Sequence, residues 1–199
     1  MKRIFDLFFS LALLLLLLPM LIFFGLIISV TSKGGIFFKQ QRVGKDQQPF
    51  WLIKFRTMHP DSEKFGLITV GDRDPRVTAV GKFLRKTKLD ELPQIINILK
   101  GEMSFVGPRP EVPKYISYYE EQYLEILKVR PGLTDLASLQ YIEESRLLGE
   151  SHDPERTYIE EVLPAKLDLQ LRYVLDNSLA LDVKILIQTA LKILRTLVG

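Results

Sequence analysis

The sequence contains no cysteine, and this absence removes several classes of chemistry. Without thiols there is no disulfide framework, no cysteine nucleophile and no cysteine-ligated zinc or iron–sulfur site. Histidine is almost as scarce, because His59 and His152 are the only two in 199 residues. Glycine-rich phosphate loops of the dinucleotide-binding or Walker A type are also missing. The chemistry that remains is that of carboxylates and hydroxyl groups, or binding alone.

Charge is present but unevenly distributed along the chain. Residues 1–32 carry a net +1, residues 33–110 carry 15 Lys or Arg against 8 Asp or Glu, and residues 111–199 carry a net −5. The 47% hydrophobic composition excludes a disordered chain. A basic middle section predicts an anionic partner. We expect no nucleic acid in that role, since the basic section follows an apolar anchor and lacks interleaved stacking aromatic residues.

A charge-free stretch of membrane length runs from Leu7 to Ser32. As a straight helix it would reach about 39 Å, enough to cross a hydrocarbon core of roughly 30 Å, so a spanning anchor is one interpretation. Pro19 favours another, because a proline kink leaves two halves that are each too short to cross. Lys or Arg residues flank both ends, which favours placing both ends on the cytoplasmic side. We therefore expect residues 1–32 to form a re-entrant membrane hairpin helix that breaks at Pro19 and anchors the chain in the lipid bilayer.

Residues 33–199 are expected to form one small catalytic domain of the α/β class with mostly helical content. Apolar segments at 36–38 and 50–53, separated by a turn, predict a short β-hairpin. The helices that periodicity and stop signals predict span 77–89, 92–99, 113–128, 158–175 and 181–198. The last is amphipathic, so it either packs on the core or lies in the membrane interface.

The segment from Thr87 to Gln94 has two interpretations. Thr87 followed by Asp90 or Glu91 is typical of a capping box that opens a helix, which requires no chemistry. The same placement also suits catalysis, because a helix N-terminus and nearby cations keep a carboxylate ionised. An ionised Asp90 could act as a nucleophile on phosphorus or hold Mg²⁺. Glu91 could exchange protons as its partner.

Candidate phosphate ligands lie on either side of this segment. Arg109 stands between Pro108 and Pro110, so a rigid loop would present one planar guanidinium. Lys54 and Arg56 end the second extended segment, and strand alternation would place them on one face. Each of these cations could equally be a solvated surface charge.

Taken in order, these segments resemble the bacterial sugar transferase family, the small monotopic phosphoglycosyl transferases, over nearly the whole chain. The segments that carry the resemblance are Gln41-Arg42-Val43-Gly44, Lys54-Phe55-Arg56-Thr57-Met58, Asp74-Pro75-Arg76-Val77, Lys88-Leu89-Asp90-Glu91-Leu92-Pro93-Gln94 and the run from Lys100 to Pro110. Two positions depart from the family pattern. Leu18 stands where the family often has serine before the hairpin proline. Residues 135–138 read Asp-Leu-Ala-Ser where Gly-Leu-Ala-Gln is usual.

The resemblance implies an enzyme that transfers a phosphosugar from a UDP-sugar to a polyprenyl phosphate, the first membrane step of glycoconjugate or exopolysaccharide biosynthesis. It implies a ping-pong reaction in which Asp90 attacks the β-phosphate, releases UMP and carries an aspartyl-phosphosugar intermediate to the lipid. It implies that Asp90 binds Mg²⁺. It also implies a monotopic protein of the cytoplasmic membrane, with its active site on the cytoplasmic face, and it allows a homodimer. The site residues it implies are Asp90 and Glu91 as catalytic, with Lys54, Arg56, Arg85, Pro108, Arg109, Pro110 and Arg130 as substrate-binding.

Two other functions stay open at this point. The chain could be a non-catalytic membrane scaffold or nucleotide-sugar-binding subunit, although the intact pair of Asp90 and Glu91 argues against this. It could also be a membrane-attached phosphohydrolase, in which water takes the phosphosugar without any lipid. The sequence identifies neither the sugar nor the length of the prenol.

Overall fold

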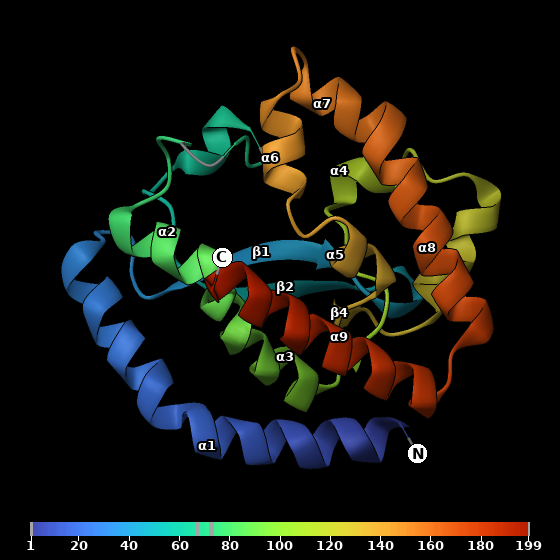
Figure 1. The fold of residues 1–199 in the computed structure, drawn as a ribbon, viewed down its shortest axis with the longest axis horizontal. Helices are drawn as coiled ribbons and strands as arrows, with labels where there is room; N and C mark the ends of the chain where they lie inside the picture. The colour runs from blue at the N-terminus through green and yellow to red at the C-terminus, as the bar shows by residue number, and fades with distance from the viewer. Residues whose placement is uncertain (1, 67, 72–73, 199) are drawn as a thin grey trace.

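The computed structural model describes residues 2–66, 68–71 and 74–198, and it confirms a mostly helical α/β chain with small sheets (Figure 1). The helices are α1 (Lys2–Thr31), α2 (Ala79–Lys86), α3 (Ile95–Lys100), α4 (Pro113–Ile116), α5 (Leu136–Gln140), α6 (Glu144–Gly149), α7 (Pro154–Thr157), α8 (Leu163–Asp176) and α9 (Leu179–Val198). The strands are β1 (Phe37–Val43), β2 (Pro49–Phe55), β3 (Ser104–Val106) and β4 (Gly132–Thr134).

Helix α1 is continuous over 30 residues and contains Pro19. Its ribbon changes direction near the middle, so the expected break is a bend rather than an interruption (Figure 1). The helix is long and apolar enough to cross a membrane, and the mean hydropathy of its most apolar window of 18 residues is 3.1. Only 11% of its most apolar window is buried, which distinguishes it from the core helix of a soluble domain. This exposed apolar surface indicates membrane association.

Strands β1 and β2 form the expected hairpin, antiparallel, with Phe37 opposite Phe55 and Gln41 opposite Trp51. A short 3₁₀ turn at Lys45–Gln47 joins them. A second sheet, formed by β3 and β4 in parallel, was not predicted from the sequence. Its strands have three residues each, too few for an alternation signal.

Several helices differ from their predicted bounds. The helix expected at 92–99 begins as a 3₁₀ helix, η3 (Leu89–Gln94), and continues as α3 until Gly101 ends it with a φ of 89°. The long helix expected at 113–128 is wrong, because the structure has α4 followed by a separate 3₁₀ helix at Glu121–Lys128. The segment is rich in tyrosine, a weak helix former, and the packing of Tyr115 and Tyr123 in the core overrides the pattern.

In the described ranges, three clusters of buried side chains form the core, and α1 packs on two of them. Phe5 and Leu13, from the first half of α1, lie against a cluster that includes Met103 and Phe105. Ile28, from its second half, is buried with Phe55 and Leu84. Both halves of the membrane helix therefore contact the same domain.

Candidate active site

The segment before Asp90 does not form the capping box that the sequence suggested. Lys88 is the N-cap of η3 and has a left-handed backbone with φ of 57°, and no side chain caps this helix. The Thr87 hydroxyl instead donates to the carbonyl of Phe83 at 2.9 Å. The left-handed residue turns the chain between α2 and η3, and the two acids follow directly after the turn.

Asp90 is buried, with 7% of its surface exposed, and its Oδ1 has no hydrogen-bond partner among the residues that the structure describes. Burial raises the pKa of Asp90, and the charge of Glu91 raises it further. Lys54, Arg85 and Lys88 oppose this shift. Because most buried polar atoms are paired, a buried carboxylate oxygen without a partner in cationic surroundings indicates a functional position.

Glu91 has both oxygens paired. Its Oε1 accepts from Lys54 Nζ at 2.9 Å and from Arg109 Nη2, and its Oε2 accepts from Arg109 Nη1 at 3.0 Å. Burial alone would raise the pKa of Glu91, but the charges of Arg109 and Lys54 outweigh it and hold the pKa well below its usual range. The charge of Glu91 in turn raises the pKa of Arg109. Glu91 is thus the ionised counter-ion of two cations.

Arg85 reaches the site from α2 and is held by two hydroxyl groups. Its Nε donates to Thr57 Oγ1 at 2.8 Å, and its Nη1 donates to Thr69 Oγ1 at 3.0 Å. Gly81 makes the close packing of α2 possible, because a Cβ there would lie 2.0 Å from the carbonyl oxygen of Thr57. Burial lowers the pKa of Arg85, and the Asp90 charge counteracts part of this shift.

The loop that carries Arg109 is fixed at both ends. The Pro108 carbonyl accepts from the Gly132 amide at 2.9 Å, and the Pro110 carbonyl accepts from Arg42 Nη1 at 2.9 Å. The Arg109 amide donates to Asp135 Oδ2 at 3.1 Å. The loop therefore presents the Arg109 side chain to Glu91 from a rigid backbone.

Two of the predicted substrate-binding residues lie apart from this cluster. Arg56 donates to the carbonyls of Gly35 and Phe37 at 3.1 and 3.2 Å, next to the end of α1. Arg130 donates to the Gly101 carbonyl at 2.9 Å. The structure thus brings together Lys54, Arg85, Asp90, Glu91 and the Pro108–Pro110 loop, while Arg56 and Arg130 bind backbone carbonyls elsewhere.

Sequence reasoning missed the residues that support the cluster. Arg42 braces the Arg109 loop, Thr57 and Thr69 orient Arg85, and Asp135 binds the Arg109 amide. Arg42 and Thr57 lie inside two of the segments that resemble the family, so the sequence contained a signal for both. Asp135 was noted only as a departure, although it is fully buried and also accepts from Gln170 Nε2 at 3.0 Å.

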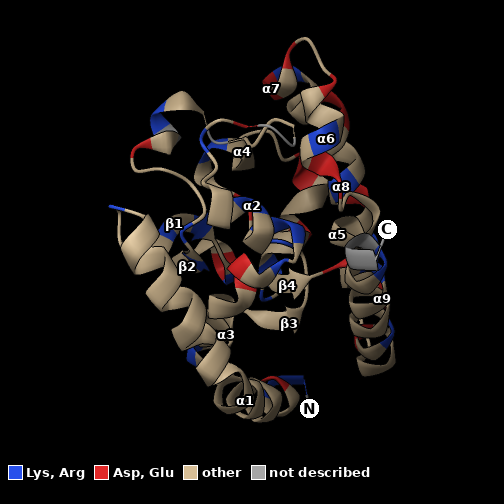
Figure 2. Cartoon of the chain, turned by 60° about the vertical axis from the view of Figure 1, so that its left-hand side comes forward, with Lys and Arg blue, Asp and Glu red and all other residues tan. Residues whose placement is uncertain are grey.

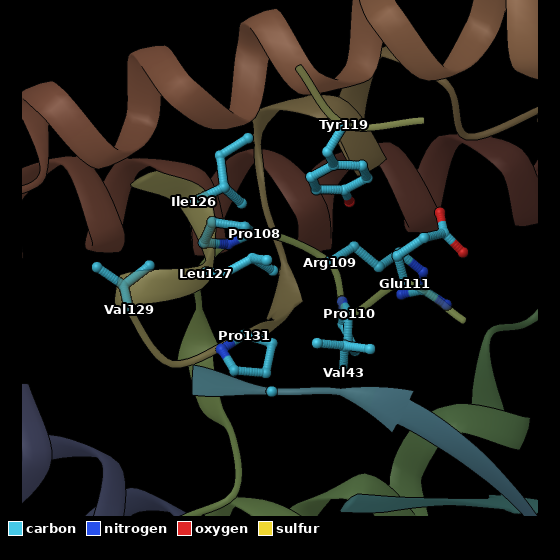
Figure 3. Close-up of a pocket in the computed structure, with 11 residues that line it drawn as sticks. Val43, Pro108, Arg109, Pro110, Glu111, Tyr119, Ile126, Leu127, Val129 and Pro131 are labelled. Carbon is cyan, nitrogen blue, oxygen red and sulfur yellow. The ribbon is translucent and has the colours of Figure 1, made fainter. Parts of the chain in front are cut away.

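A small cavity lies beside Arg109, lined by the Arg109 loop, the end of β1 and the segment from Tyr119 to Pro131 (Figure 3). Its volume is about 10 Å³. That is roughly the space of a single water molecule. It cannot hold a nucleotide or a sugar.

Charged residues are unevenly distributed over the structure (Figure 2). Figure 2 shows acidic and basic segments together between the β1–β2 hairpin, α2 and α3, whereas α1 is almost free of charge beyond its first turns. Over the described residues, no group of three or more Asp, Glu or His side chains could hold a metal. Mg²⁺ is often held by one or two carboxylates together with substrate phosphates. The free oxygen of Asp90 fits that donor set, whereas the paired oxygens of Glu91 do not.

Comparison with known proteins identifies the family to which the chain is similar. The family model described as bacterial sugar transferase matches residues 1–196. A UDP-glucose:undecaprenyl-phosphate glucose-1-phosphate transferase of Klebsiella pneumoniae is 37% identical, over 96% of this chain and 39% of its own length. A UDP-N-acetylgalactosamine-undecaprenyl-phosphate N-acetylgalactosaminephosphotransferase of Aeromonas hydrophila is 36% identical, over 88% of this chain and 39% of its own length.

A shorter relative aligns over most of its length. An exopolysaccharide production protein of Rhizobium leguminosarum bv. phaseoli is 37% identical, over 95% of this chain and 92% of its own length. The chain thus spans about two fifths of the first two relatives and nearly all of the third. These matches confirm the resemblance inferred from the motifs, and the chain belongs to the bacterial sugar transferase family.

Proposed function

We propose that the chain transfers a phosphosugar from a UDP-sugar to undecaprenyl phosphate or a related polyprenyl phosphate, with Asp90 as the covalent nucleophile. The observation that carries the proposal is the buried Oδ1 of Asp90 beside the Lys54–Glu91–Arg109 cluster, an oxygen that accepts no hydrogen bond from any residue in the described part of the chain. Family membership supports the reaction class, and the names of the Klebsiella and Aeromonas relatives supply the donor and acceptor classes.

In the first step, a carboxylate oxygen of Asp90 attacks the β-phosphorus of the UDP-sugar. The bond between that phosphorus and the oxygen bridging to the α-phosphate breaks, and UMP leaves with the bridging electrons. Lys54, Arg85 and Arg109 neutralise the diphosphate and the charge that develops on the leaving group. Glu91 holds Lys54 and Arg109 in place before the substrate arrives.

In the second step, an oxygen of the polyprenyl phosphate attacks the same phosphorus, and the bond to Asp90 breaks. The product is a polyprenyl diphosphate sugar, and the Asp90 carboxylate is regenerated. One cluster of cations serves both steps, because each step transfers the same phosphoryl group between oxygen atoms.

Asp90 is the residue that would hold Mg²⁺, through the oxygen that has no other partner. When bound, the ion would withdraw charge from the substrate phosphates.

We further propose that α1 is re-entrant, so that the active site faces the cytoplasm at headgroup depth. A spanning helix would leave its far end on the other side of the bilayer. Both ends of α1 instead contact one domain, through Arg3 donating to the Ile98 carbonyl at 2.6 Å and through the burial of Ile28. The bend near the middle of α1, a helix that contains Pro19, supports a return of the chain to the side from which it entered (Figure 1). We also propose that α9 lies in the same interface. Its exposed apolar side chains support this, and they are Leu179, Val183, Ile187, Leu191 and Leu194.

The test of the reaction is UMP release from a panel of UDP-sugars with Mg²⁺, using the purified chain with and without undecaprenyl phosphate. We expect lipid-dependent turnover, together with a phosphosugar adduct on the protein that Asp90→Asn lacks. Asp168→Asn is the matched control, because Asp168 accepts a hydrogen bond from Tyr123 away from the site. Continuous UMP release without lipid would identify a phosphohydrolase instead. No release from any donor would contradict the proposal and favour a scaffold.

The test of the topology uses the absence of native cysteine. One cysteine is added before Met1 in one variant, and Lys33→Cys is made in another. A membrane-impermeant maleimide should label neither in intact cells and both after permeabilisation. Labelling of either position in intact cells would show that α1 spans the bilayer.

A further inference from the structure

One acid of the membrane helix is buried against the domain rather than exposed. Asp6 lies one residue before the apolar run and is 2% exposed. Its Oδ1 accepts from Ser104 Oγ at 3.0 Å and from the Phe105 amide at 3.1 Å. Because an ionisable group in a membrane helix is costly unless it is paired, its presence indicates a function, and its partners lie on β3.

Strand β3 leads directly into the loop that carries Arg109. Ser104 and Phe105 belong to β3, and Gly107 follows one residue after the strand ends. The Gly107 amide donates to the Thr134 carbonyl at 3.0 Å, and a Cβ on Gly132 would lie 2.1 Å from the Gly107 nitrogen. This close packing leaves the backbone little room to absorb a displacement before Arg109.

The end of β3 is linked to the first turn of α1 a second time. The Tyr173 hydroxyl donates to Asp182 Oδ1 at 2.6 Å, and its oxygen lies 3.3 Å from the Val106 carbonyl oxygen. Lys2 in turn donates to the Tyr173 hydroxyl at 2.9 Å and forms an ion pair with Asp182. Both ends of this short strand are therefore bound, directly or through Tyr173, to residues in the first two turns of the membrane helix.

We propose that Asp6 is a positioning residue that couples the seating of α1 on the domain to the placement of Arg109. Asp6 fixes the position of β3 by accepting hydrogen bonds from Ser104 and Phe105, and the Arg109 guanidinium then donates to Glu91. Without it, a buried amide and a buried hydroxyl lose their acceptor, and β3 shifts to find another. The effect on rate rests on the proposed function, whereas the effect on the loop can be measured without any substrate.

The first experiment measures amide hydrogen exchange of the full chain in nanodiscs, resolved to single residues. In Asp6→Ala, the Phe105 and Arg109 amides should both exchange at least about tenfold faster, the scale of a lost hydrogen bond to a charged group. Ser10→Ala is the control, since Ser10 is equally buried in α1 but its hydroxyl donates to the Leu7 carbonyl of the same helix. It should leave both amides unchanged. Faster exchange at Phe105 alone, with Arg109 unchanged, would overturn the proposal.

The second experiment measures UMP release by the same variants. Asp6→Ala should lower kcat/KM about tenfold or more, and Asp6→Asn, which keeps an acceptor oxygen, should recover part of the loss. In an Arg109→Lys background, Asp6→Ala should lower kcat/KM by a much smaller factor. The effects of two substitutions are not additive when one residue acts through the other. Full additivity of the two changes would contradict the coupling.

Failure of the proposed function and failure of the role of Asp6 give different results in these experiments. If wild type releases no UMP from any donor, the proposed function fails, and the exchange experiment still decides the role of Asp6. If Asp6→Ala does not fold, Ser104→Ala replaces it, since it removes one donor and leaves the carboxylate in place. That variant should also speed exchange at Arg109, and unchanged exchange would reject the proposal.

Discussion

Asp90 and Glu91 are adjacent in the chain, yet their carboxylates differ in hydrogen bonding and in the direction of their pKa shifts. Glu91 accepts hydrogen bonds from Lys54 and Arg109, whereas Oδ1 of Asp90 accepts none from the residues described. The pKa of Glu91 lies well below its usual range because of these cations, and the pKa of Asp90 is raised by burial and by the charge of Glu91. Two neighbouring acids with pKa values shifted in opposite directions are typical of a site that divides roles between them.

Replacing Asp90 by asparagine should stabilise the protein while it abolishes transfer. The folded-state pKa of Asp90 is raised, so its carboxylate opposes folding increasingly as the pH rises above the unfolded value of about 3.9, and fully above the folded pKa. Asp90→Asn removes this cost, and the melting temperature at pH 7 should rise. Transfer should fall more than about a thousandfold, as for the loss of other enzymatic nucleophiles. Thermal unfolding and UMP release on the same preparation test both effects.

The pH dependence provides the control for this prediction. The stability advantage of Asp90→Asn should shrink as the pH falls through the folded pKa of Asp90 and vanish below about 3.9, the ordinary value for aspartate. Adduct formation by wild type should decline over the same acidic range as the nucleophile is protonated. A stability difference that does not change with pH would refute this assignment of the pKa shift.

Replacing Glu91 by glutamine should destabilise the protein by about 3 kcal/mol, because it leaves Lys54 and Arg109 without their counter-ion. The folded pKa of Glu91 is lowered, so its contribution is complete above the unfolded value of about 4.3 and is lost as the pH falls through the folded pKa. Chemical denaturation at pH 7 and at acidic pH measures the difference in the free energy of unfolding between wild type and Glu91→Gln. Glu155→Gln is the control, since its pair with Lys114 is half exposed and should be worth less than about 1 kcal/mol.

Arg109 and Arg56 should differ sharply in their effect on the reaction. Arg109→Met removes a cation from the cluster and should lower kcat/KM by roughly a hundredfold. Arg56→Met removes hydrogen bonds to the carbonyls of Gly35 and Phe37 and should leave KM for the UDP-sugar within about twofold. Steady-state kinetics on both variants test the difference. An equal loss in Arg56→Met would place Arg56 at the substrate after all.

The contact between Gly107 and Gly132 should tolerate no side chain. An alanine Cβ at position 132 would lie 2.1 Å from the Gly107 nitrogen and 2.4 Å from its carbonyl oxygen, so β3 and β4 would have to separate. We expect a loss of about 2 kcal/mol in the free energy of unfolding, together with reduced transfer. Gly25→Ala is the matched control, because its Cβ meets Ile36 at an ordinary distance of 3.5 Å. Equal stability of the two variants would contradict this account.

Much of the fold could be predicted from local patterns. The apolar run predicted α1, the paired apolar segments predicted the β1–β2 hairpin, and Gly101 predicted the end of α3. These signals are local, since each depends on period, length or one glycine. The pairing of β3 with β4 joins residues far apart in the chain, and no local pattern carries that information.

The site was predictable in its chemistry but less so in its geometry. The motifs pointed to Asp90, Glu91 and Arg109, and the structure brings these together. Alternation paired Arg56 with Lys54, but β2 ends at Phe55, so the rule does not extend to the next residue. The capping box failed for a similar reason, because the left-handed backbone at Lys88 depends on how α2 and η3 pack and not on the sequence between them.

The contacts at the two ends of α1 bear on how this protein can be divided. Arg3 donates to the last carbonyls of α3, Asp6 binds β3, and Ile28 fills the core beside Phe55. The helix is thus a structural part of the domain rather than an interchangeable tether. Removal of residues 1–32 would uncover apolar surface and unpaired polar groups on the domain instead of releasing a soluble fragment. An unrelated membrane span fused in its place would restore attachment to the bilayer without restoring the fold.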